Sequence, residues 1–270
     1  MCSINDHFSQ NDGSRSLVEV FMSREYFRNT DRIEFTVTMA CTGRCKHCSE
    51  GDHINCKDHI DPDVATDAVR KICENFTIRS LMTFGGEPLL YPDVVCAIHR
   101  TAKEAGIPVR QLITNGFFSK DKEKIRKTVC DLAESGVNDL LLSIDAFHQE
   151  TIPTEPVRTF AEYVVEAGIP ARYSPAWLVS PEDDNPYNMK TREILAEFAD
   201  LKIPVGPGNV IFPSGNALKY LKEYLDENME NPYEDDPADI RSISFSENGD
   251  VLNGNIYEKD ILEILEEYQP

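Results

Sequence analysis

The sequence predicts an α/β protein whose parallel strands form a partial (β/α)6 barrel, followed by a small C-terminal α+β extension. Three observations support this fold class. Six short apolar segments are each followed by a helical segment. Polar or glycine-rich motifs follow four of these segments, where such a fold places its active site. The length of 270 residues suits one large domain with an appendage.

The predicted strands share short runs of apolar and β-branched residues bounded by turn residues. They are Ile33–Met39, Leu81–Phe84, Val109–Ile113, Asp139–Ile144, Ala171–Leu178 and Val205–Phe212. The first alternates apolar and polar side chains, which indicates one buried face. The sixth is interrupted by Pro207 and Gly208.

The helices between these strands have apolar stripes and recognisable ends. Asp61 and Pro62 open the first helix, because proline is favoured at the first helical position. Gly136 ends the third helix as a left-handed cap. The predicted helices after the first cover 93–105, 121–135, 154–168 and 187–198.

The C-terminal part departs from this alternation. It is predicted to contain a helix over 217–224, a hairpin around Asn248-Gly249 and a closing helix over 256–268. Residues 220–239 carry eight acidic residues and predict an exposed linker, with partner docking as the alternative. The expected domains are therefore an N-terminal segment 1–30, a barrel 31–215 and an extension 216–270; Leu17–Phe27 fits either a strand or a short helix.

Charge and composition exclude several functions. The net charge of −20 repels nucleic-acid phosphates and anionic membranes, so neither is a predicted partner. The first 16 residues lack the basic start and apolar run of a signal peptide, and no apolar run reaches the roughly 20 residues that span a bilayer. All eight cysteines lie at or before Cys130, which fits a reducing, cytoplasmic location.

Cys41, Cys45 and Cys48 place three thiols within eight residues. Three thiolates on one short loop can bind three irons of a cubic iron–sulfur cluster and leave the fourth iron open to a substrate or cofactor. The alternative is a structural zinc site. Its fourth ligand would come from the nearby side chains, which are His47, His53, Cys56 and His59. The triplet alone leaves both readings open.

The three cysteines, with an aromatic residue before the last, resemble the cluster motif of the radical S-adenosylmethionine (radical SAM) superfamily. Gly85-Gly86-Glu87-Pro88, after the next strand, resembles that superfamily's second motif. The resemblance covers about 31–215 and implies a partial TIM-like barrel. It further implies one [4Fe–4S] cluster, S-adenosyl-L-methionine as cosubstrate, and an electron donor such as flavodoxin or ferredoxin. Reductive cleavage of S-adenosylmethionine would yield a 5′-deoxyadenosyl radical that abstracts hydrogen from a substrate.

The resemblance assigns roles near the cofactor. Cys41, Cys45 and Cys48 would ligate three irons. Gly85 and Gly86 would let the backbone approach the methionyl ammonium, since neither has a Cβ.

The same resemblance places further side chains around S-adenosylmethionine. His47 would lie near the adenine, or it is an exposed loop histidine. Glu87 would accept from the ammonium or fix its own turn. Ser143 and Asp145 would hold the ribose and methionyl groups, although Asp145 equally suits a cap.

Two further residues are candidates for binding S-adenosylmethionine, and each has a purely structural alternative. Arg158 is a candidate for the methionyl carboxylate, or it is an exposed helical arginine. Asn115 would line the cofactor pocket, or it only forms the turn after the third predicted strand.

Three residues are candidates for a role in the reaction of the substrate. His148 would touch the substrate or act as an acid or base, with a satisfied loop histidine as the alternative. Tyr173 would relay a radical or pack in the core. Cys56 would donate a hydrogen atom or be an ordinary loop thiol.

Residues 246–256, with the helix after them, resemble the SPASM-type domain of radical enzymes that modify peptides. That domain binds auxiliary clusters through cysteines, and this chain has no cysteine after Cys130. The expected substrate is therefore a peptide, in a modification of the RiPP type, or a small molecule. The alternatives are an activating protein for a glycyl-radical enzyme and a zinc-stabilised binding protein without catalysis.

Overall fold

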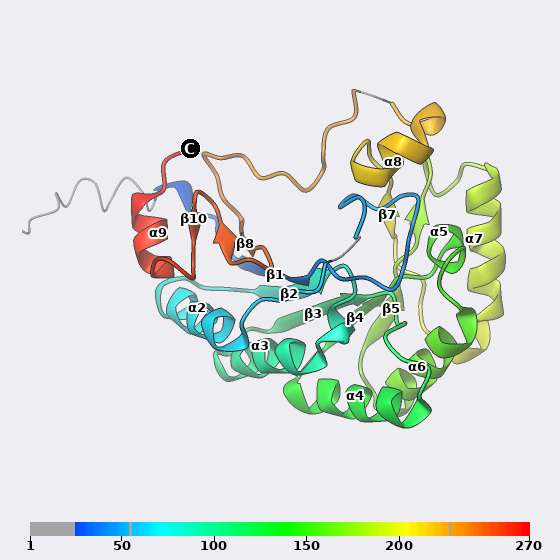
Figure 1. The fold of residues 1–270 in the computed structure, drawn as a ribbon, viewed down its shortest axis with the longest axis horizontal. Helices are drawn as coiled ribbons and strands as arrows, with labels where there is room; N and C mark the ends of the chain where they lie inside the picture. Colours follow the sequence, from blue (N-terminus) through cyan, green and yellow to red (C-terminus); the bar gives the residue numbers. More distant parts are fainter. Residues whose placement is uncertain (1–24, 54–55, 227) are drawn as a thin grey trace, which may run out of the picture.

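The computed structural model describes residues 25–53, 56–226 and 228–270. Predictions that fall on residues 1–24, including the absent signal peptide and most of Leu17–Phe27, lie outside the described residues. The described part confirms the predicted fold class: a curved, mostly parallel sheet carries helices on its outer face (Figure 1). None of the described helices is long and apolar enough to cross a membrane.

The main sheet has the strand order β10-β9-β8-β1-β2-β3-β4-β5, and β6 and β7 form a separate pair. The strands are β1 (Arg32–Thr38), β2 (Ser80–Gly85), β3 (Val109–Thr114), β4 (Asp139–Leu142), β5 (Ala171–Tyr173), β6 (Ala176–Trp177), β7 (Asn209–Val210), β8 (Ser242–Phe245), β9 (Asp250–Val251) and β10 (Gly254–Asn255).

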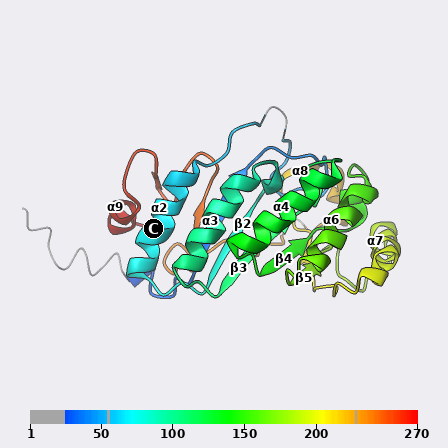
Figure 2. The ribbon, with the colours of Figure 1, turned by 90° about the horizontal axis from the view of Figure 1, so that it is seen from below.

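Helices α2, α3, α4 and α6 lie in a row along the outer face of the sheet (Figure 2). The α-helices are α2 (Pro62–Asn75), α3 (Pro92–Glu104), α4 (Lys122–Ser135), α5 (Ala146–Gln149), α6 (Thr154–Glu166), α7 (Pro186–Glu197), α8 (Gly215–Tyr220) and α9 (Ile261–Glu267). Short 3-10 turns are η1 (Pro88–Leu90), η2 (Ala199–Leu201) and η3 (Lys222–Tyr224).

Strand β1 lies at the centre of the sheet and begins the core. Ile33, Phe35 and Val37 are fully buried, as the alternation predicts. On one side β1 pairs in parallel with β2, with Arg32 opposite Ser80. On the other it pairs in parallel with β8, with Arg32 opposite Ser242.

The helix ends follow the capping chemistry of the sequence. Asp61 accepts hydrogen bonds from the backbone N–H groups of Asp63 and Val64 and begins α2, with Pro62 in its first turn. Gly136 ends α4 with a φ of 94°, a conformation that favours glycine. These caps fix where each helix leaves its strand.

The predicted fifth and sixth strands are wrong in extent. Ala171–Leu178 divides into β5 and β6, which have three and two residues. Of Val205–Phe212 only Asn209–Val210 forms a strand, because Gly208 has a φ of 69° and the proline before it donates no hydrogen bond. An isolated bridge from Tyr173 to Val205 keeps the two segments adjacent.

The C-terminal extension is also arranged differently from a simple hairpin. Strand β8 pairs antiparallel with β9 across the Asn248-Gly249 turn, which confirms the predicted hairpin. In addition, β8 joins the main sheet beside β1, and β9 pairs antiparallel with β10. The closing helix begins at Ile261 rather than at residue 256, because Asp260 caps it through the Leu262 N–H. The acidic segment after η3 crosses from the α8 side to the α9 side (Figure 1).

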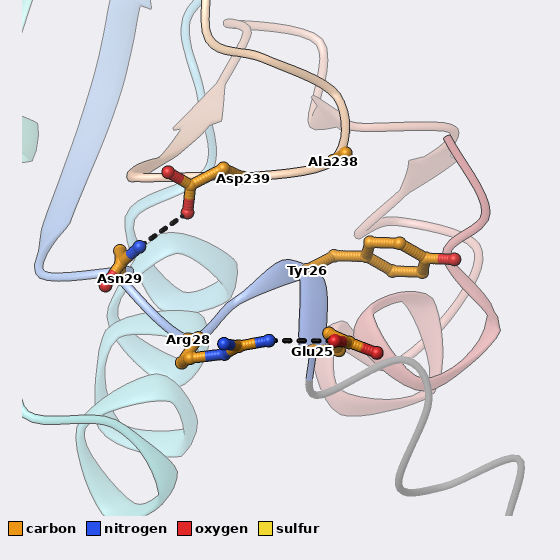
Figure 3. Close-up of a pocket in the computed structure, with 6 residues that line it drawn as sticks. All are labelled: Glu25, Tyr26, Arg28, Asn29, Ala238 and Asp239. Carbon is orange, nitrogen blue, oxygen red and sulfur yellow. Dashed lines mark hydrogen bonds and ion pairs between the residues drawn. The ribbon is translucent and has the colours of Figure 1, made fainter.

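The predicted site motifs share the carboxyl edge of the parallel strands. A surface pocket of about 350 Å³ lies instead at the amino end of β1, between Glu25–Asn29 and Ala238–Asp239 (Figure 3). The Asn29 side chain donates to Asp239 there, at 2.8 Å. Because it lies at the opposite end of β1, this pocket is separate from the cysteine loop.

Candidate active site

The cysteine loop leaves the carboxyl end of β1 and presents three thiols. Cys45 is buried, and Cys41 and Cys48 are half-buried. The Gly43 N–H donates to the Cys41 sulfur at 3.3 Å, and the Asn115 amide approaches the same sulfur at 3.7 Å. The loop is therefore held with its sulfurs inward by its own backbone and by the end of β3.

Burial raises the pKa of each thiol. It raises the pKa of Cys41 to about 11, with the charge of Glu87 adding to the effect, and it also raises the pKa of Cys45 and Cys48. A thiolate is the metal-binding form, so a bound cation is what would reverse these shifts. Three thiols that are at least half-buried therefore suit cationic irons as partners.

A group of other possible ligand side chains lies at the same edge of the sheet. The ligand atoms of His47, Asp145 and His148 all lie within 4.8 Å of one another. The cysteine loop itself offers three thiols, which is the number that three irons of a cluster need. A structural zinc site would need a fourth ligand.

His53 contacts the loop from the side opposite Asn115. Its Nε2 lies 3.1 Å from the Cys48 sulfur and its Nδ1 lies 2.7 Å from the carbonyl oxygen of Met39. Because that carbonyl only accepts, Nδ1 carries the proton of the neutral ring. The sequence suggested His53 only as a zinc ligand, and its anchoring to the end of β1 was not foreseen.

Gly85 and Gly86 lie against the end of β1. The Gly86 N–H donates to Thr38 O, and the Glu87 N–H donates to Ala40 O, both at 2.7 Å. A Cβ on Gly86 would lie 2.7 Å from Met39 O and would overlap Ala40. This close approach of two backbones requires glycine, independently of any bound ammonium.

Glu87 holds its own turn together. It is fully buried, and its carboxylate accepts from Leu89 N–H at 2.9 Å, Thr114 hydroxyl at 2.7 Å and Asn115 N–H at 2.8 Å. Burial raises its pKa to about 7 in spite of these donors. Of its two predicted roles, the contacts describe the fixing of the turn, and they tie the ends of β2 and β3 together.

Asp145 and His148 form a carboxylate–imidazole pair at the end of β4. Asp145 caps α5 and also accepts from the Ala176 N–H at 2.9 Å and from His148 Nδ1 at 2.8 Å. Burial acts to raise the pKa of Asp145, but His148 and these hydrogen bonds outweigh it and hold the pKa well below its usual range. An ionised Asp145 keeps the proton on Nδ1 and leaves the Nε2 lone pair available.

His47 lies beside this pair. Its ring is 4.8 Å from that of His148 and 5.0 Å from that of Phe147, and its buried Nδ1 has no partner within the described residues. Burial, with His148 adding to the effect, lowers the pKa of His47 to about 4. The three close side chains do not form a good metal site, because the Asp145 oxygens already accept four hydrogen bonds.

Ser143 and Asn115 also lie at this edge. Ser143 is buried, with its N–H donating to Thr114 O at 2.9 Å. Asn115 uses its side-chain oxygen to accept from Phe117 N–H and so closes the turn after β3, while its amide faces the cysteine loop. Both predicted roles of Asn115 are thus compatible with its position.

Two predicted site residues, Arg158 and Tyr173, have other partners. Arg158 lies on α6, where it pairs with Asp200 and Glu162. Tyr173 is fully buried and packs edge-on against Phe198, at 5.9 Å, which is its core-packing alternative. Cys56 is half-buried in the segment after the loop, and its role stays a prediction.

A segment that the sequence did not single out also contacts the loop. Ser214 and Asn216, which follow β7, hydrogen-bond the backbone of the cysteine loop. The only signal in the sequence is a turn-forming Ser-Gly-Asn run, which is common in loops without such a role.

Comparison with known proteins agrees with the motifs. A family model described as the Radical SAM superfamily matches residues 35–172. A GTP 3′,8-cyclase of Clostridium perfringens is 30% identical over 132 residues, which are 48% of this chain and 39% of the relative. A probable GTP 3′,8-cyclase of Saccharolobus islandicus is 27% identical over 224 residues, which are 76% of this chain and 68% of the relative.

Solved structures share the fold. Streptococcus suis SuiB bound to the precursor peptide SuiA matches 89% of this chain and 65% of its own, with a TM-score of 0.59 and 16% identity. The native enzyme anSMEcpe with bound AdoMet matches 89% of this chain and 81% of its own, with a TM-score of 0.54 and 13% identity. The family match spans more than half of the residues and contains the cysteine loop, the glycine turn and the Asp145–His148 pair, so the chain belongs to the radical SAM superfamily.

Proposed function

We propose that this chain is a radical SAM enzyme with a single [4Fe–4S] cluster bound by Cys41, Cys45 and Cys48. The observation that carries the proposal is the presence of three thiols on one loop, one buried and two half-buried, beside the Gly85–Glu87 turn at the carboxyl edge of the strands. The reaction is hydrogen abstraction from a substrate. The absence of cysteines after Cys130 leaves no thiolate ligand for an auxiliary cluster in residues 216–270.

When bound, a reduced cluster supplies an electron to the sulfonium of S-adenosylmethionine, which releases methionine and a 5′-deoxyadenosyl radical. The residues of the chain bind and orient the reactants and exclude water. The turn at Gly85 and Gly86 places backbone groups beside the thiols, and Glu87 keeps that turn rigid through three hydrogen bonds. His47, whose ring is tilted against that of Phe147, offers its ring and its Nδ1, which has no partner within the described residues, to the adenosyl group.

His148 is the proposed acid or base on the substrate side. Asp145 accepts a hydrogen bond from Nδ1, so Nε2 is the ring nitrogen that can take or give a proton. A residue that is oriented by a buried carboxylate and lies only partly exposed is well suited to that role, since its side chain retains 16% exposure. The Asp145 carboxylate itself acts as a positioning group.

The substrate class that we favour is a peptide. SuiB, which shares the fold over 89% of this chain, is described as bound to a precursor peptide. The net charge of −20 favours a neutral or cationic substrate over a polyanion. A small molecule is the second candidate, and its support is the name GTP 3′,8-cyclase carried by the curated relatives. The proposed electron donor is a flavodoxin or ferredoxin.

The test is anaerobic purification followed by reduction. We expect a brown protein with about four irons per chain that releases 5′-deoxyadenosine from S-adenosylmethionine when reduced. A colourless protein that holds one zinc ion, even after anaerobic reconstitution with iron and sulfide, would overturn the proposal. A cluster without release of 5′-deoxyadenosine would overturn the catalytic part alone.

A further inference from the structure

The segment Ser214–Asn216, here called the clasp, binds the outer side of the cysteine loop. The Asn216 N–H donates to Cys48 O at 2.9 Å, and its side-chain amide donates to Cys45 O and Gly51 O, each at 3.2 Å. The Ser214 hydroxyl donates to Ser49 O at 3.0 Å. Four carbonyl groups from Cys45 to Gly51 are thus bound by two residues, Ser214 and Asn216, that lie about 165 positions further along the chain.

Gly215 lets the clasp come this close. Its φ is +46°, and a Cβ there would lie 2.5 Å from Cys48 O and 2.7 Å from Gly51 N. Any other residue would therefore push the clasp away from the loop. The contact is between two backbones, so it specifies the path of the loop and not only its general location.

Ser214 does not serve its usual local purpose. It is the N-cap residue of α8, a position where a serine side chain commonly bonds the backbone of the first helical turn. Here it makes no such cap, and its hydroxyl donates to Ser49 O instead. The short α8 gives up a capping interaction, and the cysteine loop gains a hydrogen bond.

The clasp also orients a donor toward a ligand sulfur. In a planar trans peptide the C=O and the following N–H point in opposite directions. The peptide between Ser49 and Glu50 has its oxygen on the Ser214 hydroxyl, and its N–H acts to lower the pKa of the Cys48 thiol, against the effect of burial. Holding this oxygen outward therefore keeps the Glu50 N–H directed toward the sulfur. Hydrogen bonds to ligand sulfurs are one determinant of the reduction potential of a cluster.

We propose that Ser214, Gly215 and Asn216 form a positioning element that fixes the cysteine loop and directs the Glu50 N–H to the Cys48 sulfur, which sets the cluster potential. This inference rests on the proposed function for the cluster, but the fixing of the loop does not. The residues act through the loop and touch no reactant. The clasp lies outside residues 35–172, so it is a property of the later part of this chain.

The experiment compares Asn216→Ala and Ser214→Ala with a matched control, Asn188→Ala. Asn188 is fully buried, and its amide donates to Leu178 O at 3.0 Å and to Ser180 O at 2.7 Å, in a loop that does not carry the cysteines. Urea unfolding of each variant measures the general loss of stability. Ser214→Ala is the variant that folds if Asn216→Ala does not, because the Ser214–Ser49 bond is exposed.

Two readouts separate positioning from general stability. In the metal-free protein, hydrogen exchange of the loop peptide 41–53 is expected to be about tenfold faster in Asn216→Ala than in the control. In the anaerobically reconstituted protein, electron paramagnetic resonance titration is expected to give a more negative cluster potential for Ser214→Ala and an unchanged one for Asn188→Ala. Equal loop exchange and equal potentials in clasp and control variants would overturn the inference. If the parent protein binds no iron, the proposed function fails, while loop exchange still decides the role of the clasp.

Discussion

The strands β1–β4 and the strands β5–β10 differ in both length and chemistry. The first four have four to seven residues each and end at the cysteine loop, the glycine turn, Asn115 and Asp145. The later ones have two to four residues each, and their ends carry no thiol and no buried carboxylate that faces the loop. The long strands therefore provide the reacting groups. The short ones hold them in place from both sides, through the clasp after β7 and through β8 beside β1.

This difference teaches that a site built on regular strands is completed by irregular segments. Regular strands place side chains at a common edge because their pairing fixes the register. Irregular segments contribute backbone contacts that no periodicity predicts. The following experiments test this division, in order of expected effect.

Cys45→Ser is the most severe test of the first region, which is formed by β1–β4 and the motifs at their ends. We expect complete loss of the visible absorbance of the reconstituted protein, because a serine hydroxyl is a poor substitute for an iron-binding thiolate. Cys130→Ser is the control, since this thiol is exposed on α4. Equal iron content in the two variants would show that the loop does not hold the cluster.

Phe245→Ala tests the second region, which is formed by β5–β10. Phe245 is 2% exposed and stacks on Phe35 with ring centroids 4.6 Å apart, so its removal leaves a cavity between β8 and β1. We expect the free energy of unfolding in urea to fall by about 4 kcal/mol. Tyr233→Ala, at a position with 62% exposure, is expected to change it by less than about 0.5 kcal/mol. A loss below about 1 kcal/mol for Phe245→Ala would mean that β8 is not part of the same cooperative unit as β1.

Gly86→Ala tests the contact between β1 and the turn after β2. The added Cβ would overlap the Ala40 carbonyl, and we expect a loss of about 3 kcal/mol in the free energy of unfolding. Gly168→Ala is the control: its φ is +69° and its added Cβ would meet nothing within 4 Å, so only about 1 kcal/mol is expected. Equal losses in the two variants would show that the close approach to Ala40 does not explain the need for glycine at position 86.

His99→Leu tests the core behind the long strands. His99 is fully buried and bonds Thr83 at 2.8 Å, and burial lowers its pKa to about 3. Between this value and about 6.5 the unfolded state binds the proton more readily, so stability is lost as the pH falls through that window.

We expect the parent protein to lose about 1.4 kcal/mol per pH unit more than His99→Leu in this window. The comparison uses urea unfolding of the metal-free proteins at several pH values. Parallel curves for the two proteins would show that His99 is protonated in the folded state.

The first region was predictable because its signals are local. The alternation in Ile33–Met39 identifies β1, and Asp61 with Pro62 identifies the start of α2. The common edge of the motifs follows from parallel pairing, without any knowledge of the contacts. The assignment of Glu87 to its turn was among the stated alternatives, and its three hydrogen bonds agree with it.

The second region was less predictable because distant contacts decide it. Ser242–Phe245 forms the predicted hairpin with β9, but nothing in its sequence indicates that it also pairs with β1. The clasp has the composition of any turn. Arg158 has the charge for a carboxylate ligand, but its position on α6 gives it Asp200 and Glu162 as partners.

The pairing of β1 with β8 has a kinetic consequence. Arg32 and Ser242 are neighbours in space but about 210 residues apart in sequence, so their pairing closes a very long loop. Such contacts form late, because the entropy of loop closure must be overcome before the contact is gained. During synthesis, the edge of β1 that pairs with β8 therefore stays unpaired while the cysteine loop is already present. Cluster insertion into this protein is expected to follow the emergence of β8 from the ribosome.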